Sequence, residues 1–411
     1  MGKEKSYKEE IIDWGDWGSK LGKEVCFNSH QNCPAVLVVP HQQGNFRGPV
    51  GFLWRKEILK QMADYYQDKE SGEIRWLITQ DVENDGAGGK PQFFTLFGTP
   101  EVFYNLGWEI ITMTADDLAR TGRFPAIMVN QIDTKGLNEA NAPLFQAMMN
   151  GYGDALRRAR LINITGELAI MKHSITAFCD VDSAEQLILT WGGACIGLNS
   201  SDCYVSGKDI RPGLSIIGFN DPGYRCNGGT RLSELIIQTW GKDFRKVMEN
   251  QQARFFIKNL CMPSMSYART VTRLVGWQEN GNIGDPLAKI YGIAHITGGG
   301  LWIKLGELLP EGVGAKLDTM PIPADVLLQA QKLADKTDRP MSDWECYSTF
   351  HGGCGMLLIV EEQDEDVIMQ EALKDGIHAM KVGKTISSLD KEIIVHSRFA
   401  GGKVLSSFSP E

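Results

Sequence analysis

The chain has 411 residues, of which 43% are hydrophobic and 23% charged, a composition typical of a globular protein with two domains rather than one. Its 51 acidic residues outnumber 42 basic ones and give a net charge of −9, which argues against nucleic acid as the main partner. A local basic pocket for a phosphorylated small molecule stays compatible with this charge.

No stretch reaches the roughly 18 apolar residues of a membrane span. The first ten residues are charged and contain no apolar signal core. These two features predict a cytoplasmic protein that does not contact membranes.

The pattern along the chain predicts an α/β fold. Residues 1–50 are rich in Gly, Trp, Asn and Gln, and we expect an irregular N-terminal arm lying over the body. After it, hydrophobic periodicity predicts helices at about 52–66, 141–160, 229–240, 323–334 and 364–375, and strands at about 74–80, 126–133, 161–165, 214–218, 290–297, 356–361, 379–385 and 392–396. A polar segment near 200–213 suggests the boundary between a domain at 51–205 and one at 206–411.

Nine scattered cysteines include no C-x-x-C pair, so neither a disulfide framework nor a zinc ribbon is indicated. The tightest group with metal-ligand character is Cys346, His351 and Cys354. The alternative interpretation is a set of reduced thiols in a glycine-rich turn.

Two glycine-rich segments carry the strongest chemical signal. Asp85-Gly86-Ala87-Gly88-Gly89-Lys90 follows a predicted strand, where glycines let the backbone approach a phosphate, an Asp can hold Mg²⁺ and a Lys can neutralise phosphate oxygens. The segment from His295 through Thr297 to Gly298-Gly299-Gly300 precedes a helix pattern, so an anion site there is plausible, with His295 as an acid or base. The alternatives are a plain surface turn and a structural histidine whose ring nitrogens are satisfied by buried partners.

Two acidic positions are weaker signals. Adjacent carboxylates at Asp116 and Asp117 can share Mg²⁺ with a nucleotide, although acidic residues at a helix N-terminus look the same in sequence. Glu167, after Gly166, follows a short predicted strand and is either a metal ligand or a helix-start acid.

These segments resemble a known family in order. The run from Tyr291 to Leu301 looks like the H-I-T-G-G-G signature of the aminoimidazole ribonucleotide (AIR) synthase family, the phosphoribosylformylglycinamidine cyclo-ligases. Further matches are Leu308 to Lys316, Thr349 to Met356 (similar to T-F-N-x-G-x-G-M), Asp85 to Lys90 (D-G-V-G-T-K), Asp117 (N-D), Gly166-Glu167 (G-G-E-T), Asn227-Gly228 (S-N-G) and Met262 to Tyr267 (P-T-R-I-Y).

The resemblance implies two AIR synthase-like α/β domains, with the N-terminal sheet closing a barrel against its copy in a homodimer. It implies an ATP- and Mg²⁺-dependent cyclo-ligase that converts formylglycinamidine ribonucleotide to aminoimidazole ribonucleotide in de novo purine synthesis. It assigns catalysis to His295 and Lys90, the substrate loop to Thr297, Gly298, Gly299 and Gly300, metal binding to Asp85, Asp117 and Glu167, and ATP or phosphate binding to Asp85, Gly86, Gly88, Gly89, Lys90, Gly166, Asn227 and Gly228.

Several positions depart from the family pattern. Arg225 stands where the family has a His, and the other changes include Gly89, Asp116, Ile170, Thr190, Trp302, Leu305 and His351. Because these changes fall in the substrate and metal loops, two alternatives stay open. One is an ATP-dependent relative with another substrate, and the other is a non-catalytic nucleotide-binding protein.

Overall fold

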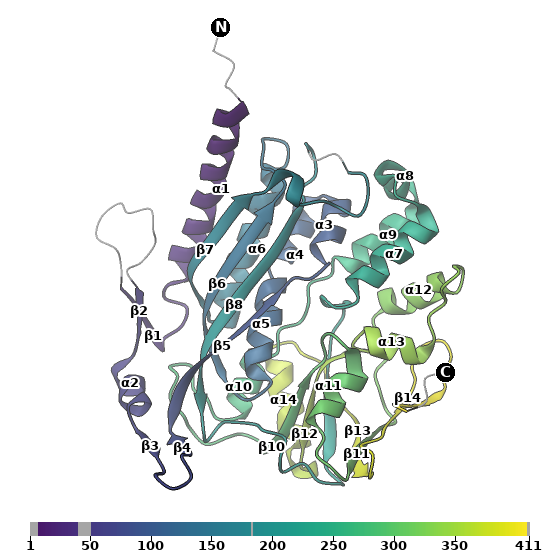
Figure 1. The fold of residues 1–411 in the computed structure, drawn as a ribbon. Coiled ribbons are helices and arrows are strands. Elements are labelled where there is room, and N and C mark those ends of the chain that lie inside the picture. The colour runs from purple at the N-terminus through teal and green to yellow at the C-terminus, as the bar shows by residue number, and fades with distance from the viewer. Residues whose placement is uncertain (1–6, 40–50, 182–183, 409–411) are drawn as a thin grey trace.

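The computed structural model describes residues 7–39, 51–181 and 184–408. Within them the chain folds around two separate sheets, one built from residues 78–200 and the other from residues 215–406. Figure 1 shows the two sheets one above the other, with helices against each and between them. The predicted mixed α/β architecture with two domains is confirmed.

The N-terminal sheet has four strands in the order β5 (Ile78–Gly86), β8 (Leu189–Ser200), β6 (Phe124–Thr134) and β7 (Ile162–Ile170). Only β6 and β7 run parallel, joined by the helix α6 (Ala142–Ala159) as a parallel crossover requires. Helices α3 (Pro91–Phe97), α4 (Pro100–Leu106) and α5 (Glu109–Ala119) complete this layer. In one chain the sheet is open, with β5 and β7 at its two edges.

The C-terminal sheet has seven strands in the order β10 (Ile290–His295), β12 (Cys354–Val360), β9 (Ser215–Asn220), β13 (Ala379–Ser387), β11 (Val313–Leu317), β14 (Ile393–His396) and β15 (Val404–Ser406). Every residue of β12 is buried, so this strand lies at the centre of the core. The helices of this part of the chain are α7 (Gly229–Trp240), α8 (Phe244–Glu249), α9 (Gln251–Leu260), α10 (Ala268–Leu274), α11 (Gly300–Leu308), α12 (Asp325–Ala334), α13 (Asp343–Thr349) and α14 (Glu365–Lys374), with a short 3₁₀ turn at Glu362–Asp364. Of these, α8 and α9 pack against α3 of the N-terminal layer. A second 3₁₀ turn, Lys172–Ser174, lies between β7 and β8.

The expectation of an irregular N-terminal arm is wrong for the described part, because Tyr7–Ser29 forms the helix α1. Three glycines lower its helix propensity, but packing on the body overrides them. Cys26 Sγ donates to the carbonyl oxygen of Asn163 at 2.8 Å, and the ring of Trp17 lies 6.1 Å from that of Phe145. The helix therefore lies over the body at the β7 side of the sheet, as Figure 1 shows. Residues 40–50 of the expected arm lie outside the described residues.

The helix expected at 52–66 is also wrong. The segment divides into β2 (Gly51–Trp54), α2 (Lys56–Met62) and β3 (Tyr65–Gln67). The first part becomes a strand because β1 (Val36–Val39) pairs with it, with Val36 opposite Trp54, and β3 pairs with β4 (Ile74–Trp76) in a second small hairpin. Pairing with other strands, which the local sequence pattern does not reveal, determines the secondary structure of this segment.

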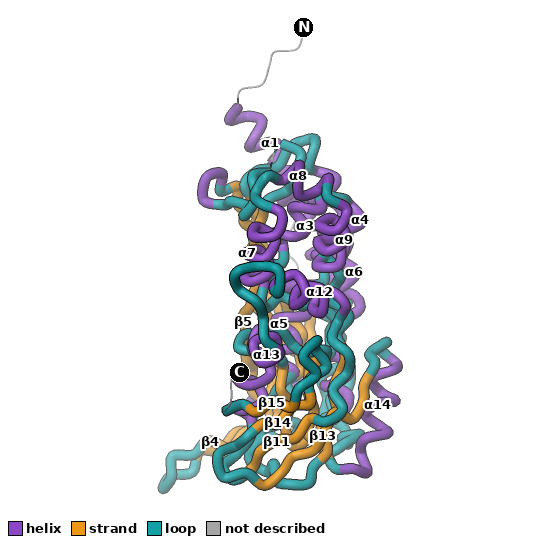
Figure 2. The backbone as a smooth tube through the Cα atoms, turned by 90° about the vertical axis from the view of Figure 1, so that its right-hand side faces the viewer, coloured by secondary structure: helices purple, strands orange, loops and turns teal. Residues whose placement is uncertain are grey.

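The elements between the sheets bring the two domains together. In Figure 2, seen at right angles to Figure 1, α5 lies at mid-height in the molecule, between the N-terminal helices above and the strands of the C-terminal sheet below. All eleven residues of α5 are buried, and the helix packs against α10 of the C-terminal domain. No helix in the described part of the chain is long and apolar enough to cross a membrane.

Two glycines of α6 provide a test of the packing behind the sheet. A Cβ at Gly151 would lie 1.9 Å from the carbonyl oxygen of Tyr104, whereas a Cβ at Gly153 would meet only Val25 at 3.8 Å. We predict that Gly153→Ala raises the free energy of unfolding by up to about 1 kcal/mol through helix propensity. Gly151→Ala should lower the free energy of unfolding by about 1–3 kcal/mol, because the backbone at Tyr104 must move to make room for the added methyl group. Urea unfolding of both variants measures the difference, and equal values would contradict the close α4–α6 contact.

Candidate functional site

Helix α5 brings three acidic side chains to the domain interface. Glu109 and Asp116 are fully buried and Asp117 is 9% exposed. Asp116 and Asp117 lie near the C-terminal end of this helix, not at its N-terminus, so the favourable helix dipole does not explain them. Buried carboxylates require partners, and each of the three finds them in the C-terminal domain.

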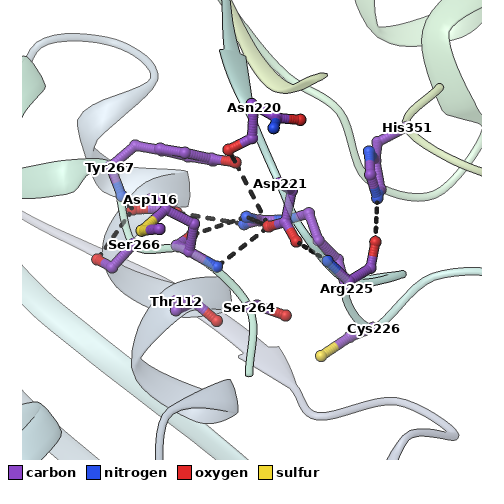
Figure 3. Close-up of polar contacts among 12 residues, drawn as sticks. Thr112, Asp116, Asn220, Asp221, Arg225, Cys226, Ser264, Ser266, Tyr267 and His351 are labelled. Atoms are coloured by element: carbon purple, nitrogen blue, oxygen red, sulfur yellow. Dashed lines mark hydrogen bonds and ion pairs between the residues drawn. The ribbon is translucent and has the colours of Figure 1, made fainter. Parts of the chain in front are cut away.

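Arg225 provides the central contact and is 1% exposed (Figure 3). Its Nη1 donates to Asp221 Oδ2 and to the carbonyl oxygen of Met265, each at 2.8 Å. Its Nη2 donates to Asp116 Oδ2 at 3.2 Å and to His295 Nε2 at 2.8 Å. The guanidinium also lies 5.0 Å from the centre of the Tyr267 ring. One cation thus joins α5 to three segments of the other domain.

Backbone amides also donate hydrogen bonds to the two carboxylates that Arg225 contacts. Asp116 Oδ1 accepts from the amides of Tyr267 and Ala268 at 2.8 Å, at the start of α10. Asp221 accepts from Gly223 N at 3.0 Å and Met265 N at 3.1 Å. Burial raises the pKa of Asp116 even against Arg225. Burial would raise the pKa of Asp221 as well, but Arg225, the other nearby positive groups and the Gly223 amide together outweigh it and lower that pKa.

His295 lies between Arg225 and Asp117. Its Nδ1 is 2.8 Å from Asp117 Oδ1, while its Nε2 faces the guanidinium. An arginine can only donate, so Nε2 accepts and Nδ1 carries the proton donated to Asp117. Burial would raise the pKa of Asp117, but the hydrogen bond from His295 and the charges of Arg120 and Lys304 outweigh it and lower that pKa.

This geometry corresponds to the structural alternative for His295. The residue is 1% exposed and both of its ring nitrogens have buried partners. Both ring nitrogens are thus engaged, and the Nδ1 contact holds His295 against the Asp117 carboxylate. Its predicted catalytic role lacks geometric support for this reason.

Lys90 lies in a second buried ionic cluster. Its Nζ is 2.8 Å from Glu109 Oε1 and 3.1 Å from Ser264 Oγ, and both charged side chains are fully buried. Glu109 also accepts from Ser264 N, Ser264 Oγ and Cys226 Sγ. The Lys90 charge is therefore neutralised within the protein, and the ammonium does not face an open phosphate site.

Glycines allow the loops of the two domains to touch. Gly88 has φ +55°, and a Cβ there would lie 2.7 Å from the carbonyl oxygen of Cys226. A Cβ at Gly89 would lie 3.5 Å from the Cα of Gly229. Backbone approach between domains is thus a sufficient reason for Gly88, whereas a Cβ at Gly89 would make only ordinary van der Waals contact. Both glycines were predicted to cradle phosphate. The preceding Gly86 donates its amide to Asp85 Oδ1 at 2.7 Å.

The two glycine loops of the C-terminal domain also meet. A Cβ at Gly298 would lie 3.6 Å from Asn227 Oδ1, and a Cβ at Gly228 would clash with the Phe350 ring. Gly299 and Gly300 have positive φ and lead from Thr297 into α11. The Nδ2 atom of Asn227 is buried without a hydrogen-bond partner. A buried donor left unpaired is costly, so this amide could donate to a ligand that reaches the loops.

The predicted metal ligands separate into two places. Burial raises the pKa of Asp85, and the negative charge of Asp117 raises it further. These two carboxylates therefore lie close enough to interact. Gly166 and Glu167 lie on β7, at the opposite edge of the sheet from Asp85 on β5. Three strand spacings of about 4.8 Å separate these edges. The described residues contain no group of three His, Cys, Asp or Glu side chains able to hold a metal ion, so the three predicted ligands do not form one site in this chain.

Cys346, His351 and Cys354 likewise do not come together as a group of three ligands within the described residues. His351 is buried; its Nε2 donates to the carbonyl oxygen of Gly223 at 2.9 Å and its Nδ1 accepts from Gly353 N at 3.1 Å. Both cysteines are buried free thiols. Cys346 lies in α13 and Cys354 begins β12, so the two thiols flank the glycine-containing turn at His351 instead of lying within it.

Sequence reasoning missed the partners that complete the site. Glu109, Asp221 and Ser264 were not singled out as functional residues, although all three are buried polar residues at the interface. Glu109 gives no local signal, since it begins an apolar helix. Asp221 and Ser264 fall within segments that resemble family loops. Their place in those segments is the sequence feature that could have identified them as functional residues.

Comparison with known proteins places the chain in a family. Residues 79–198 match the N-terminal domain of AIR synthase related proteins, and residues 283–396 match the C-terminal domain. The chain belongs to the AIR synthase related family, as a diverged member.

Curated relatives and solved structures agree with this placement. The chain is 27% identical over 305 residues to the phosphoribosylformylglycinamidine cyclo-ligase of Thermococcus kodakarensis, covering 74% of this chain and 78% of the relative. It is 26% identical over 284 residues to the enzyme of the same name from Staphylococcus saprophyticus, covering 68% and 74%. The fold is similar to E. coli HypE, with a TM-score of 0.52 at 12% identity over 96% of this chain and 98% of that one. It is also similar to the hydrogenase maturation protein HypE in complex with ATP, with a TM-score of 0.50 at 14% identity over 86% and 92%.

The buried His351 predicts a pH effect on stability. Burial holds its pKa below the ordinary 6.5 despite the nearby Asp221 carboxylate. The folded state therefore stays neutral while the unfolded state gains a proton, and the stabilisation present above pH 6.5 is lost as the pH falls toward the folded pKa. His351→Asn introduces the residue typical of the family. Its melting temperature should fall less between pH 7 and pH 5 than that of the wild type. Equal losses by calorimetry would contradict the neutral buried histidine.

Proposed function

We propose that this chain is an ATP- and Mg²⁺-dependent ligase that acts at the domain interface. The observation that carries this proposal is that the loop containing Asn227, whose amide nitrogen is buried and unpaired, meets Gly88 of the loop after Asp85 and Gly298 of the loop after His295, the partner of Asp117. Membership of the AIR synthase related family, whose members are ATP-dependent enzymes, supports it. So does the fold shared with a HypE that was solved in complex with ATP.

In this proposal the chain's residues hold the reactants. Asp85 and Asp117 would bind Mg²⁺, since carboxylates are its preferred protein ligands. The amides of Gly298, Gly299 and Gly300, at the start of α11, would receive phosphate oxygens. ATP supplies a phosphoryl group that converts a poor leaving group, an amide oxygen, into a good one. His295, held by Arg225, would keep the Asp117 carboxylate charged and oriented toward the metal.

The substrate we propose is formylglycinamidine ribonucleotide. The curated relatives carry the name of its cyclo-ligase. In that reaction the formyl amide oxygen accepts the phosphoryl group, a nitrogen of the same molecule attacks the activated carbon, and phosphate leaves as the imidazole ring closes. The product, aminoimidazole ribonucleotide, belongs to de novo purine synthesis, which would place the protein in the cytoplasm.

A second candidate is an ATP-dependent relative with another substrate, and Arg225 favours it. The family has a histidine at this position, but arginine stays protonated and cannot act as a base. Its hydrogen bond to His295 Nε2 removes a second acid-base group as well. Together with the neutralised Lys90, this leaves the site with fewer groups for proton transfer than the family pattern provides.

ADP release by the purified protein tests the two candidates. Release that depends on formylglycinamidine ribonucleotide, with aminoimidazole ribonucleotide as product, is the expected result. Release with another acceptor only would overturn the substrate and keep the enzyme class. No release with any acceptor, while ATP remains bound, would overturn the ligase proposal itself.

The metal ligand has its own test. Asp117→Asn keeps an oxygen that can accept from His295, so the fold should persist, but it removes the charge that attracts Mg²⁺. We predict that calorimetry shows ATP affinity in Mg²⁺ weakened at least tenfold, against less than twofold for the exposed control Asp338→Asn. Unchanged affinity in Asp117→Asn would show that this carboxylate is not a ligand.

We propose a homodimer in which the open faces of two N-terminal sheets close a barrel. The open face bears a shallow cavity of about 640 Å³ lined by residues of β5, β6 and β8, including Gln131 and Thr190. Val82 on β5 is 56% exposed. Light scattering should give twice the chain mass, and Val82→Glu should shift the mass toward one chain, unlike Leu389→Glu in the distant C-terminal domain. A wild-type mass of one chain would rule the dimer out.

A further inference from the structure

A further pocket at the domain interface lies outside the residues proposed to bind ATP and Mg²⁺. It encloses about 270 Å³ between the end of α6, the start of α10 and the segment 263–266. Trp108 and Arg158 contribute to it from the N-terminal domain, and Ser266, Arg269 and Asp375 from the C-terminal domain. A pocket of this size suits a compact small molecule.

The pocket lies beside a concentration of positive charge in an otherwise acidic chain. The arginines Arg158 and Arg160 end α6, and Arg269 and Arg273 project from α10. Arg160 itself occupies the left-handed region at φ +57°. Burial, together with the charges of Arg269 and Arg273, lowers the pKa of Arg160. Arg160, Arg269 and Arg273 therefore lie close enough to repel one another, and Arg269 lines the pocket together with Arg158.

Three of these four arginines have a carboxylate partner, but Arg160 and Arg269 share the same one. Glu279 contacts Arg160 and lies 3.3 Å from Arg269, and Asp375 lies 2.7 Å from Arg273. Thr270 donates to the same oxygen of Asp375 at 2.6 Å, so this carboxylate is already engaged.

Arg158 differs from the other three. Within the described residues, no carboxylate lies within 4 Å of it. Its Nη2 donates to the backbone carbonyl oxygen of Asp375 at 2.7 Å, and its guanidinium lies 5.7 Å from the centre of the Trp108 ring. The pocket therefore combines an unmatched guanidinium with an aromatic wall.

We propose that this pocket binds a small organic anion with a planar ring, either a phosphate or a carboxylate. Arg158 and Arg269 would bind the anionic group, because guanidinium groups match the geometry of both anions. Trp108 would contact the ring. Asp375 stays paired with Arg273 and so does not repel the ligand.

The position of the pocket connects it to the candidate site. Segment 263–266 forms one wall of the pocket, and the same segment holds the two buried ionic clusters. Ser264 bonds to Glu109, Met265 N to Asp221 and Ser266 Oγ to Asp116 at 3.4 Å. A bound anion contacts both domains and thereby favours the arrangement in which they are joined.

Calorimetry on the full-length protein tests this proposal with phenyl phosphate, inorganic phosphate and phenol as probes. Phenyl phosphate should bind more tightly than inorganic phosphate, and phenol should not bind. Arg158→Gln keeps a donor for the Asp375 carbonyl oxygen but removes the positive charge. The affinity for phenyl phosphate should therefore fall at least tenfold. The matched control is Arg157→Ala, the exposed neighbour paired with Asp154, which should change affinity less than twofold.

The two alternative outcomes are distinct. Equal phenyl phosphate affinity in the wild type and Arg158→Gln, with unchanged melting temperatures, would place the binding elsewhere and overturn the proposal. Absence of phenyl phosphate binding to the wild type would overturn it as well. Benzoate in place of phenyl phosphate distinguishes a carboxylate ligand from a phosphate ligand, and neither result depends on ligase activity.

Discussion

The contact between Arg225 and its partners is the constraint on which the rest of the domain interface depends. A guanidinium stays protonated, so its burial fixes the chemistry around it: Asp116 and Asp221 must supply negative charge, and His295 must offer a lone pair. Removing an ion from water costs several kcal/mol, which good geometry and further hydrogen bonds must offset. The amides at the start of α10 and in the loop after β9 provide those bonds, and they tie the two domains together.

This arrangement explains why a family resemblance and an altered site coexist in one chain. The glycine loops and the Asp85 and Asp117 carboxylates keep family positions, whereas an arginine replaces the family histidine. The replacement makes His295 a positioning residue for Asp117, and the parallel pair of Lys90 with Glu109 closes a second potential phosphate contact. The interface is thereby joined by two buried ionic clusters, in which Arg225, His295 and Lys90 are all engaged.

The sequence was sufficient to predict the α/β class, most elements of the C-terminal domain and the loops that meet at the interface, because strands and glycine motifs carry local signals. It did not predict α1, whose glycines disfavour helix until Leu168 and Phe145 pack against them. It also could not show that Lys90 is buried or that Glu167 lies at the far edge of the sheet. Both facts follow from strand order and long-range pairing, which no local pattern encodes.

A double-mutant cycle between Arg225 and Asp116 tests the central claim most directly. The free energies of unfolding of Arg225→Met, Asp116→Asn and the double variant are compared with that of the wild type. Each single change leaves a buried partner unmatched, so the double variant should be more stable than the sum of the single losses predicts, by about 1–3 kcal/mol. Losses that add to within about 0.5 kcal/mol would show that the two residues are not coupled, and would contradict the account of an interface joined by this ion pair.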